Sequence, residues 1–180
     1  MRFIRFFTLG VVSVLVIFSA IVWILLPSQY TIEEKVVIEA PVRKVFGKIN
    51  TLSEWQEWAL GNDPSGSQFQ FKIEGPLSGE GSIYRWQSEA GDGVLQIIDS
   101  EPFDRITLKA VMQQGQFESD IFFLCEYQKP YTVVTWTEYG NFGWNPLTRL
   151  TASMLDFAGT MEKNYRKSLD KLKEVTEAGN

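Results

Sequence analysis

The sequence predicts an α+β domain in which a curved antiparallel sheet holds a long C-terminal helix, preceded by one transmembrane helix. Three observations predict this arrangement. An uncharged, strongly apolar run occupies residues 6–26. Short runs rich in β-branched and aromatic residues, separated by turn residues, continue as far as Gly140. Beyond Pro146 the apolar residues recur every three or four positions, which is the spacing of an amphipathic helix.

The apolar run is long enough for a membrane anchor. Its 21 residues would span about 30 Å as a helix, the thickness of a bilayer's hydrocarbon core. A cleaved signal peptide is the first alternative, but its apolar region is usually shorter, and no small-x-small site precedes Pro27. A buried core helix is the second, and it would need a polar face. We therefore expect an uncleaved anchor over residues 1–28, in contact with the lipid bilayer through residues 6–26, and one domain over residues 29–180.

Charge at the two ends of the run predicts its orientation. Arg2 and Arg5 precede it, whereas Glu33 and Glu34 are the first charged residues after it. Positive residues favour the cytoplasmic side. The sequence thus predicts a single-pass protein of the cytoplasmic (inner) membrane, with its N-terminus inside and its domain on the periplasmic or extracellular side.

The elements of the domain follow in order. A strand is expected over residues 31–39, then a helix that begins near Pro41 and a short helical piece over residues 52–58. The connections between the next segments are too short for parallel crossovers, so we expect an antiparallel meander. Its strands are predicted at 68–74, 79–87, 93–101, 104–113, 116–127 and 131–140. One amphipathic helix is predicted from residue 146 to residue 175.

Several short motifs occur within residues 30–176. They are Val37-Ile38-Glu39-Ala40-Pro41 with Val45-Phe46, Trp55-Gln56-Glu57-Trp58, Gly79-Glu80-Gly81 with Trp86, Ser100-Glu101-Pro102, and Thr132-Val133-Val134-Thr135-Trp136. In this order the chain resembles the START-like superfamily called SRPBCC, and within it the polyketide cyclase/dehydrase-type proteins. The resemblance implies a helix-grip fold with a cavity between the concave face of a seven-stranded sheet and the long helix. It does not imply an enzyme, because the same scaffold serves lipid carriers, receptors and cyclases.

Residues that face that cavity, most of them apolar, are candidates for binding a hydrophobic small molecule or lipid. Alternation along two strands, and helical spacing after Pro146, place these candidates on facing sides. The alternative is that the aromatic side chains simply fill the core. The candidates are Tyr84, Trp86, Val134, Trp136, Glu138, Met154, Phe157 and Met161.

Composition excludes several kinds of chemistry. The chain of 180 residues has a formal net charge of −5, contains no histidine and has Cys125 as its one cysteine. Ser-His-Asp and Cys-His catalysis, zinc sites built from His or Cys clusters and an intramolecular disulfide are therefore excluded. No basic run could follow a phosphate backbone, so we expect no nucleic-acid partner. The sequence predicts no catalytic residue, metal site or cofactor.

Two alternative functions stay open. A cyclase or dehydratase could use Glu138 or Tyr84 as its acid or base, and Glu118 and Asp120 are further carboxylates, although solvated charges are the simpler interpretation. An interaction domain for another envelope protein is the second alternative. The aromatic turn over residues 141–146 is expected either to gate the cavity or touch the bilayer, or to cover the end of the core.

Overall fold

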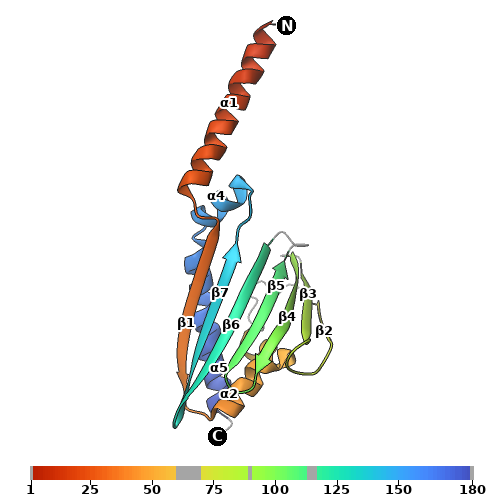
Figure 1. The fold of residues 1–180 in the computed structure, drawn as a ribbon, viewed down its shortest axis with the longest axis vertical. Helices are drawn as coiled ribbons and strands as arrows, with labels where there is room; N and C mark the ends of the chain where they lie inside the picture. The colour runs from red at the N-terminus through yellow and green to blue at the C-terminus, as the bar shows by residue number, and fades with distance from the viewer. Residues whose placement is uncertain (1, 60–69, 89–90, 113–116, 179–180) are drawn as a thin grey trace.

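A seven-stranded antiparallel sheet in the order β1-β7-β6-β5-β4-β3-β2 forms the body of the molecule (Figure 1). The computed structural model describes residues 2–59, 70–88, 91–112 and 117–178. The helices are α1 (Arg2–Leu25), α2 (Val42–Asn50), the 3₁₀ turn η1 (Leu52–Glu54), α3 (Trp55–Trp58), α4 (Pro146–Met154) and α5 (Phe157–Glu177). The strands are β1 (Gln29–Ile38), β2 (Gln70–Glu74), β3 (Ile83–Ser88), β4 (Gly91–Glu101), β5 (Arg105–Met112), β6 (Phe117–Gln128) and β7 (Tyr131–Asn141).

The predicted fold class is confirmed, including the meander from β2 to β7. The first strand adds to the last, with Tyr30 opposite Gly140 and Ile38 opposite Thr132. The strand predicted from residue 79 begins at Ile83, because Gly79 and Gly81 form a turn with positive φ angles. The strand starts predicted at residues 68 and 116 lie outside the described residues.

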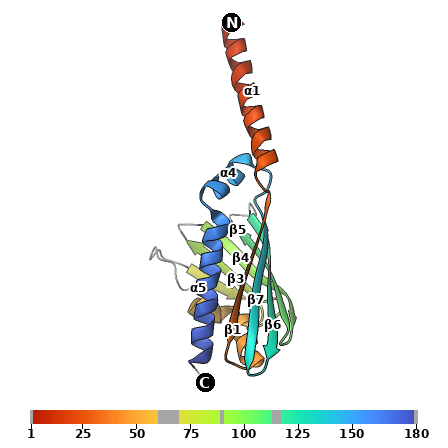
Figure 2. The same cartoon turned by 90° about the vertical axis from the view of Figure 1, so that its left-hand side faces the viewer.

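Helix α5 runs along one face of the sheet (Figure 2), and α2 and α3 share a core with α5 and that face. Alternation along β1 directs Ile32, Val36 and Ile38 toward these helices, and all three are buried. Tyr165 of α5 stacks on Trp136 of β7, with ring centroids 4.0 Å apart. The core therefore lies between the concave face of the sheet and α5.

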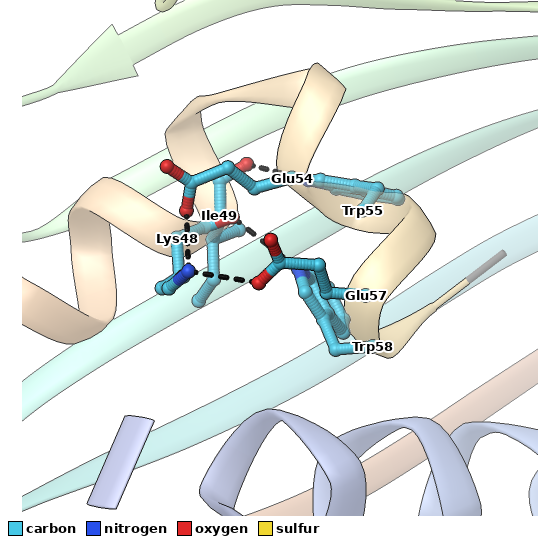
Figure 3. Close-up of polar contacts among 6 residues, drawn as sticks. All are labelled: Lys48, Ile49, Glu54, Trp55, Glu57 and Trp58. Carbon is cyan, nitrogen blue, oxygen red and sulfur yellow. Dashed lines mark hydrogen bonds and ion pairs between the residues drawn. The ribbon is translucent and has the colours of Figure 1, made fainter. Parts of the chain in front are cut away.

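The Trp55-to-Trp58 motif closes the core at the end of the molecule away from α1. Both indoles are almost fully buried, and their Nε1 atoms donate to backbone carbonyls at the end of α2. On the outer side, Lys48 forms ion pairs with Glu54 and Glu57, its Nζ atom lying 3.0 Å from Oε2 of each (Figure 3). The motif thus has a packing role.

The predicted single helix over residues 146–175 is wrong. Helix α4 ends at Met154, and α5 begins at Phe157. Between them, Asp156 adopts a left-handed conformation with a φ angle of 46°. A short interruption preserves the three-and-four spacing of apolar residues, so periodicity alone does not reveal it. The break turns α4 away from α5, toward α1 (Figures 1 and 2).

Helix α1 projects from the end of the domain that carries α4 (Figure 1). Residues Ile4–Leu25 form the one described helix that is long and apolar enough to cross a membrane. By length and composition this helix fits a membrane anchor or a signal sequence.

Candidate ligand cavity

A cavity of about 330 Å³ lies beneath α4, at the end of the sheet nearest α1. Strand ends form its floor and α4 forms its roof. Apolar and aromatic side chains supply most of the lining, with Asp92 and two threonines as polar exceptions. The lining residues are Tyr30, Trp86, Gly91, Asp92, Met112, Phe117, Phe142, Thr148, Thr151, Ala152, Leu155 and Phe157. The volume lies at the lower end of the range of small-molecule sites, about 300–1,000 Å³.

Three aromatic rings from separate elements form one wall. Tyr30 is the second residue of β1, Phe142 directly follows β7, and Phe157 is the first residue of α5. Their ring centroids lie 4.9 to 5.4 Å apart, two of the three pairs in edge-to-face contact. Such a cluster is a stiff apolar surface, because aromatic pairs favour these geometries and each ring has few rotamers.

The opposite wall is Trp86 of β3. Its partner in the neighbouring strand β4 is Gly93, and a Cβ atom at that position would lie only 2.2 Å from the indole. The missing side chain lets the ring lie flat across the sheet. Trp86 is half-buried, so part of its surface faces the cavity.

Behind Tyr30 lies a buried carboxylate. The Tyr30 hydroxyl donates to Oε1 of Glu138 at 2.8 Å, and the Tyr165 hydroxyl donates to Oε2. Glu138 is only 3% exposed. Burial, reinforced by the neighbouring Glu138 carboxylate, raises the pKa of Tyr30 and of Tyr165 well above the ordinary value for a phenol. Both phenols therefore stay protonated and keep donating.

Comparison with known proteins shows which family has this architecture. A family model described as "Polyketide cyclase / dehydrase and lipid transport" matches residues 29–177. The chain belongs to this family. The match covers the whole described sheet together with α4 and α5, and leaves out α1. No curated protein matches the chain.

Solved structures share the family fold at low identity. A hypothetical protein from Helicobacter pylori superposes with a TM-score of 0.61 at 12% identity, over 82% of this chain and 88% of that one. A protein from Mesorhizobium loti superposes with a TM-score of 0.60 at 14% identity, over 84% of this chain and 99% of that one. The Aha1 dimer from Colwellia psychrerythraea superposes with a TM-score of 0.57 at 18% identity, over 84% of this chain and 98% of that one. At these identities the likeness shows the fold alone.

Within this family fold, the eight predicted site residues separate into three groups. Trp86 and Phe157 line the cavity. Tyr84, Val134 and Trp136 are buried in the core, and Met161 is half-buried against it. Burial raises the pKa of Tyr84 to about 12.

Two of the eight lie elsewhere. Met154 does not face Trp86 or Trp136; it is 76% exposed on the outer side of α4, because the break at Asp156 ends the stripe that contained it. Glu138 faces inward as predicted but is separated from the cavity by Tyr30, and it is absent from the described lining.

Two parts of the cavity lining were not predicted from the sequence: Tyr30, and the residues of α4 that face the cavity. Tyr30 shares the inward face of β1 with Ile32 and Val36, so the alternation could have included it. The inner face of α4 has no comparable signal, because the residues that line the cavity from this helix, Thr148, Thr151 and Ala152, are small or polar and do not belong to its apolar spacing.

The other candidates from the sequence, Glu118, Asp120 and Cys125, do not form a functional site. Glu118 and Asp120 are exposed on the outer face of β6, where Glu118 pairs with Lys109 at 3.0 Å. Cys125 is buried, and burial raises the pKa of its thiol to about 12, which suppresses the reactive thiolate. Among the described residues no group of three His, Cys, Asp or Glu could hold a metal ion.

Proposed function

We propose that this chain is a membrane-anchored helix-grip domain that binds a hydrophobic small molecule or a lipid in the cavity beneath α4. The observation that carries the proposal is the cavity itself, a space of about 330 Å³ walled by Tyr30, Trp86, Phe142 and Phe157. Its size suits a small ring system or part of an acyl chain. Membership of a family that includes lipid transport supports the same class of ligand.

The polar groups of the cavity favour an amphiphile. Thr148 and Thr151 contribute hydroxyls from the roof, and Asp92 contributes a carboxylate from the sheet. A few polar groups in an apolar site fix the orientation of a ligand. An acyl chain or ring would lie against the aromatic wall, with a polar end near these groups.

The proposal includes α1 as an uncleaved anchor. Its segment Ile4–Leu25, 22 residues of predominantly apolar composition, would span about 33 Å. Arg2 and Arg5 favour a cytoplasmic N-terminus, which places the domain on the periplasmic or extracellular side of the cytoplasmic membrane. An anchored domain would meet hydrophobic ligands at the membrane surface.

A cyclase or dehydratase is the second candidate, and the burial of Glu138 favours it. Catalysis would need the carboxylate to reach a ligand. Both carboxylate oxygens instead accept hydrogen bonds from Tyr30 and Tyr165, and Tyr30 separates Glu138 from the cavity. We therefore assign Glu138 the role of holding Tyr30 in the cavity wall, and retain binding as the function.

Filling the cavity tests the proposal. Ala152 lines the cavity, and its neighbour Ser153 is exposed. We expect the full chain, extracted in mild detergent, to carry a bound hydrophobic molecule in native mass spectrometry. Ala152→Trp should remove it, while Ser153→Trp on the same helix should retain it. An empty wild-type protein, or equal occupancy in both variants, would contradict binding at this site.

A further inference from the structure

Helix α4 and the residues that flank it on both sides expose large apolar side chains to solvent. Trp144 is 78% exposed, Leu147 60%, Met154 76% and Leu155 74%. We call these four residues the α4 face. Residues 142–155 contain no acidic residue, although the chain as a whole has 22. Large apolar side chains exposed together on one short helix and its flanking residues are typical of an interaction site.

The α4 face is continuous with α1. The Trp23 indole donates through Nε1 to the backbone carbonyl of Trp144 at 3.0 Å. The two rings meet edge to face, with centroids 5.4 Å apart. Val22, next to Trp23, is only 4% exposed, whereas most of α1 is exposed. The anchor therefore contacts the domain at the α4 face.

The length of α1 sets the depth of this contact. Trp23 lies two residues before the last residue of the helix, Leu25, and so about 3 Å along the axis from its end. A helix of about 33 Å that spans a hydrocarbon core of about 30 Å places Trp23 at the boundary between acyl chains and headgroups. Tryptophan is enriched at that boundary. Trp144, in contact with Trp23, then lies at the same depth.

Arg149 is the single charged residue within residues 142–155, and its guanidinium group is already hydrogen-bonded to the backbone. Arg149 donates from Nε and Nη2 to the carbonyl oxygen of Gly143, at 3.0 and 2.8 Å. These bonds hold the Trp144 turn against α4 and satisfy part of the guanidinium. A cationic residue is also compatible with the headgroup region. The α4 segment can thus enter the interface without burying an unpaired charge.

The inner side of the same helix closes the cavity. Thr148, Thr151 and Ala152 line it from α4, and Leu155 both lines it and belongs to the α4 face. A helix whose outer side lies in the interface would bring the cavity to the membrane surface. An apolar chain could then pass between bilayer and cavity with little exposure to water.

We propose that the α4 face lies in the interface of the bilayer that holds α1, so that the cavity takes its ligand, an amphiphilic lipid, from that bilayer. The proposal rests on the proposed function, since it needs α1 to be an anchor. It goes beyond it by naming the docking surface and the source of the ligand. The commitment to lipid follows from the continuity of the α4 face with α1.

Site-directed spin labelling of the full chain tests it. The chain is reconstituted in phosphatidylethanolamine and phosphatidylglycerol vesicles with a nitroxide at Leu147→Cys or Met154→Cys. Val16→Cys, in the middle of α1, is the lipid reference. Leu77→Cys is the aqueous reference, because Leu77 is 87% exposed in the turn at the opposite end of the sheet. The buried Cys125 should stay unlabelled, which the wild-type protein checks.

Collision of each label with oxygen, which partitions into lipid, is compared with its collision with a water-soluble nickel chelate. We expect the labels at 147 and 154 to shift from the value at Leu77 toward that at Val16. Aqueous values at 147 and 154, with a lipid value at Val16, would overturn the docking while leaving the anchor intact. Protection from both reagents would show that protein covers the α4 face, and would also overturn it. An aqueous value at Val16 would overturn the anchor, and the docking with it.

Discussion

The ring of Tyr30 lies directly over Gly140, its partner across β1 and β7, and leaves no space for a side chain there. A Cβ atom on Gly140 would lie 2.1 to 2.4 Å from the ring and hydroxyl atoms of Tyr30. In this position the Tyr30 hydroxyl reaches Glu138, and its ring packs against Phe142 and Phe157. One glycine thus allows one side chain to form both a cavity wall and a buried polar contact.

Gly140→Ala should therefore act through Tyr30. The added methyl group displaces the ring, and Oε1 of Glu138 loses its donor. Leaving a buried polar group unsatisfied costs about 1–3 kcal/mol, so we expect a loss of this size in the free energy of unfolding. Chemical denaturation of the full chain in detergent measures it. Gly47→Ala is the control: its Cβ meets nothing within 4 Å, and alanine favours the helix there. Equal stability of the two variants would refute the role of Gly140.

Stability should fall at alkaline pH. The folded-state pKa of Tyr30 and of Tyr165 is raised above the unfolded value of 10.0, and that of Tyr84 is raised to about 12. The unfolded chain therefore releases these protons first. The stabilisation is fully present below pH 10 and declines as the pH rises above it. Phenolate absorbance and circular dichroism, followed together, should show three of the six tyrosines ionising only as the fold is lost. Complete ionisation of an intact fold would contradict this prediction.

The sequence predicted the architecture well because each strand and turn has a local signal. Alternation and turn residues locate the strands from β2 to β7, and short connections require antiparallel neighbours. Trp136 also lies on the inner face, where its ring stacks on that of Tyr165, as alternation predicts. The position of β1 beside β7 follows from the fold and has no local signal, since the paired residues Tyr30 and Gly140 are 110 positions apart in the chain.

The site was predicted less completely, because it depends on one break in a helix. Asp156 interrupts the helix without disturbing the apolar spacing from Leu147 to Met161. A continuous helix would have placed Met154 over the sheet. The break instead directs it outward and makes α4 the roof of a cavity. Left-handed conformations at non-glycine residues are rare and have no reliable signature in sequence.

The topology of α1 can be tested with a fusion at the C-terminus. We expect alkaline phosphatase, which is active only outside the cytoplasm, to be active when joined after Asn180. Replacing Arg2 and Arg5 with glutamate, and Gln29 with lysine, should reduce the activity by weakening the charge bias. An inactive fusion to the wild-type chain would contradict the orientation. A mature protein that begins near Pro27 would show that α1 is cleaved off and is not an anchor.

Trp86 and Trp136 should respond differently to the same substitution, since one lines the cavity and the other fills the core. Trp136 is 5% exposed and stacks on Tyr165, so Trp136→Ala should cost about 3–5 kcal/mol of stability. Trp86→Ala should cost less, because part of its indole already faces the cavity, and should weaken binding of a fluorescent fatty acid. Trp86→Phe is the conservative control and should retain binding. If Trp86→Ala unfolds the domain as much as Trp136→Ala, Trp86 belongs to the core and the cavity loses that wall.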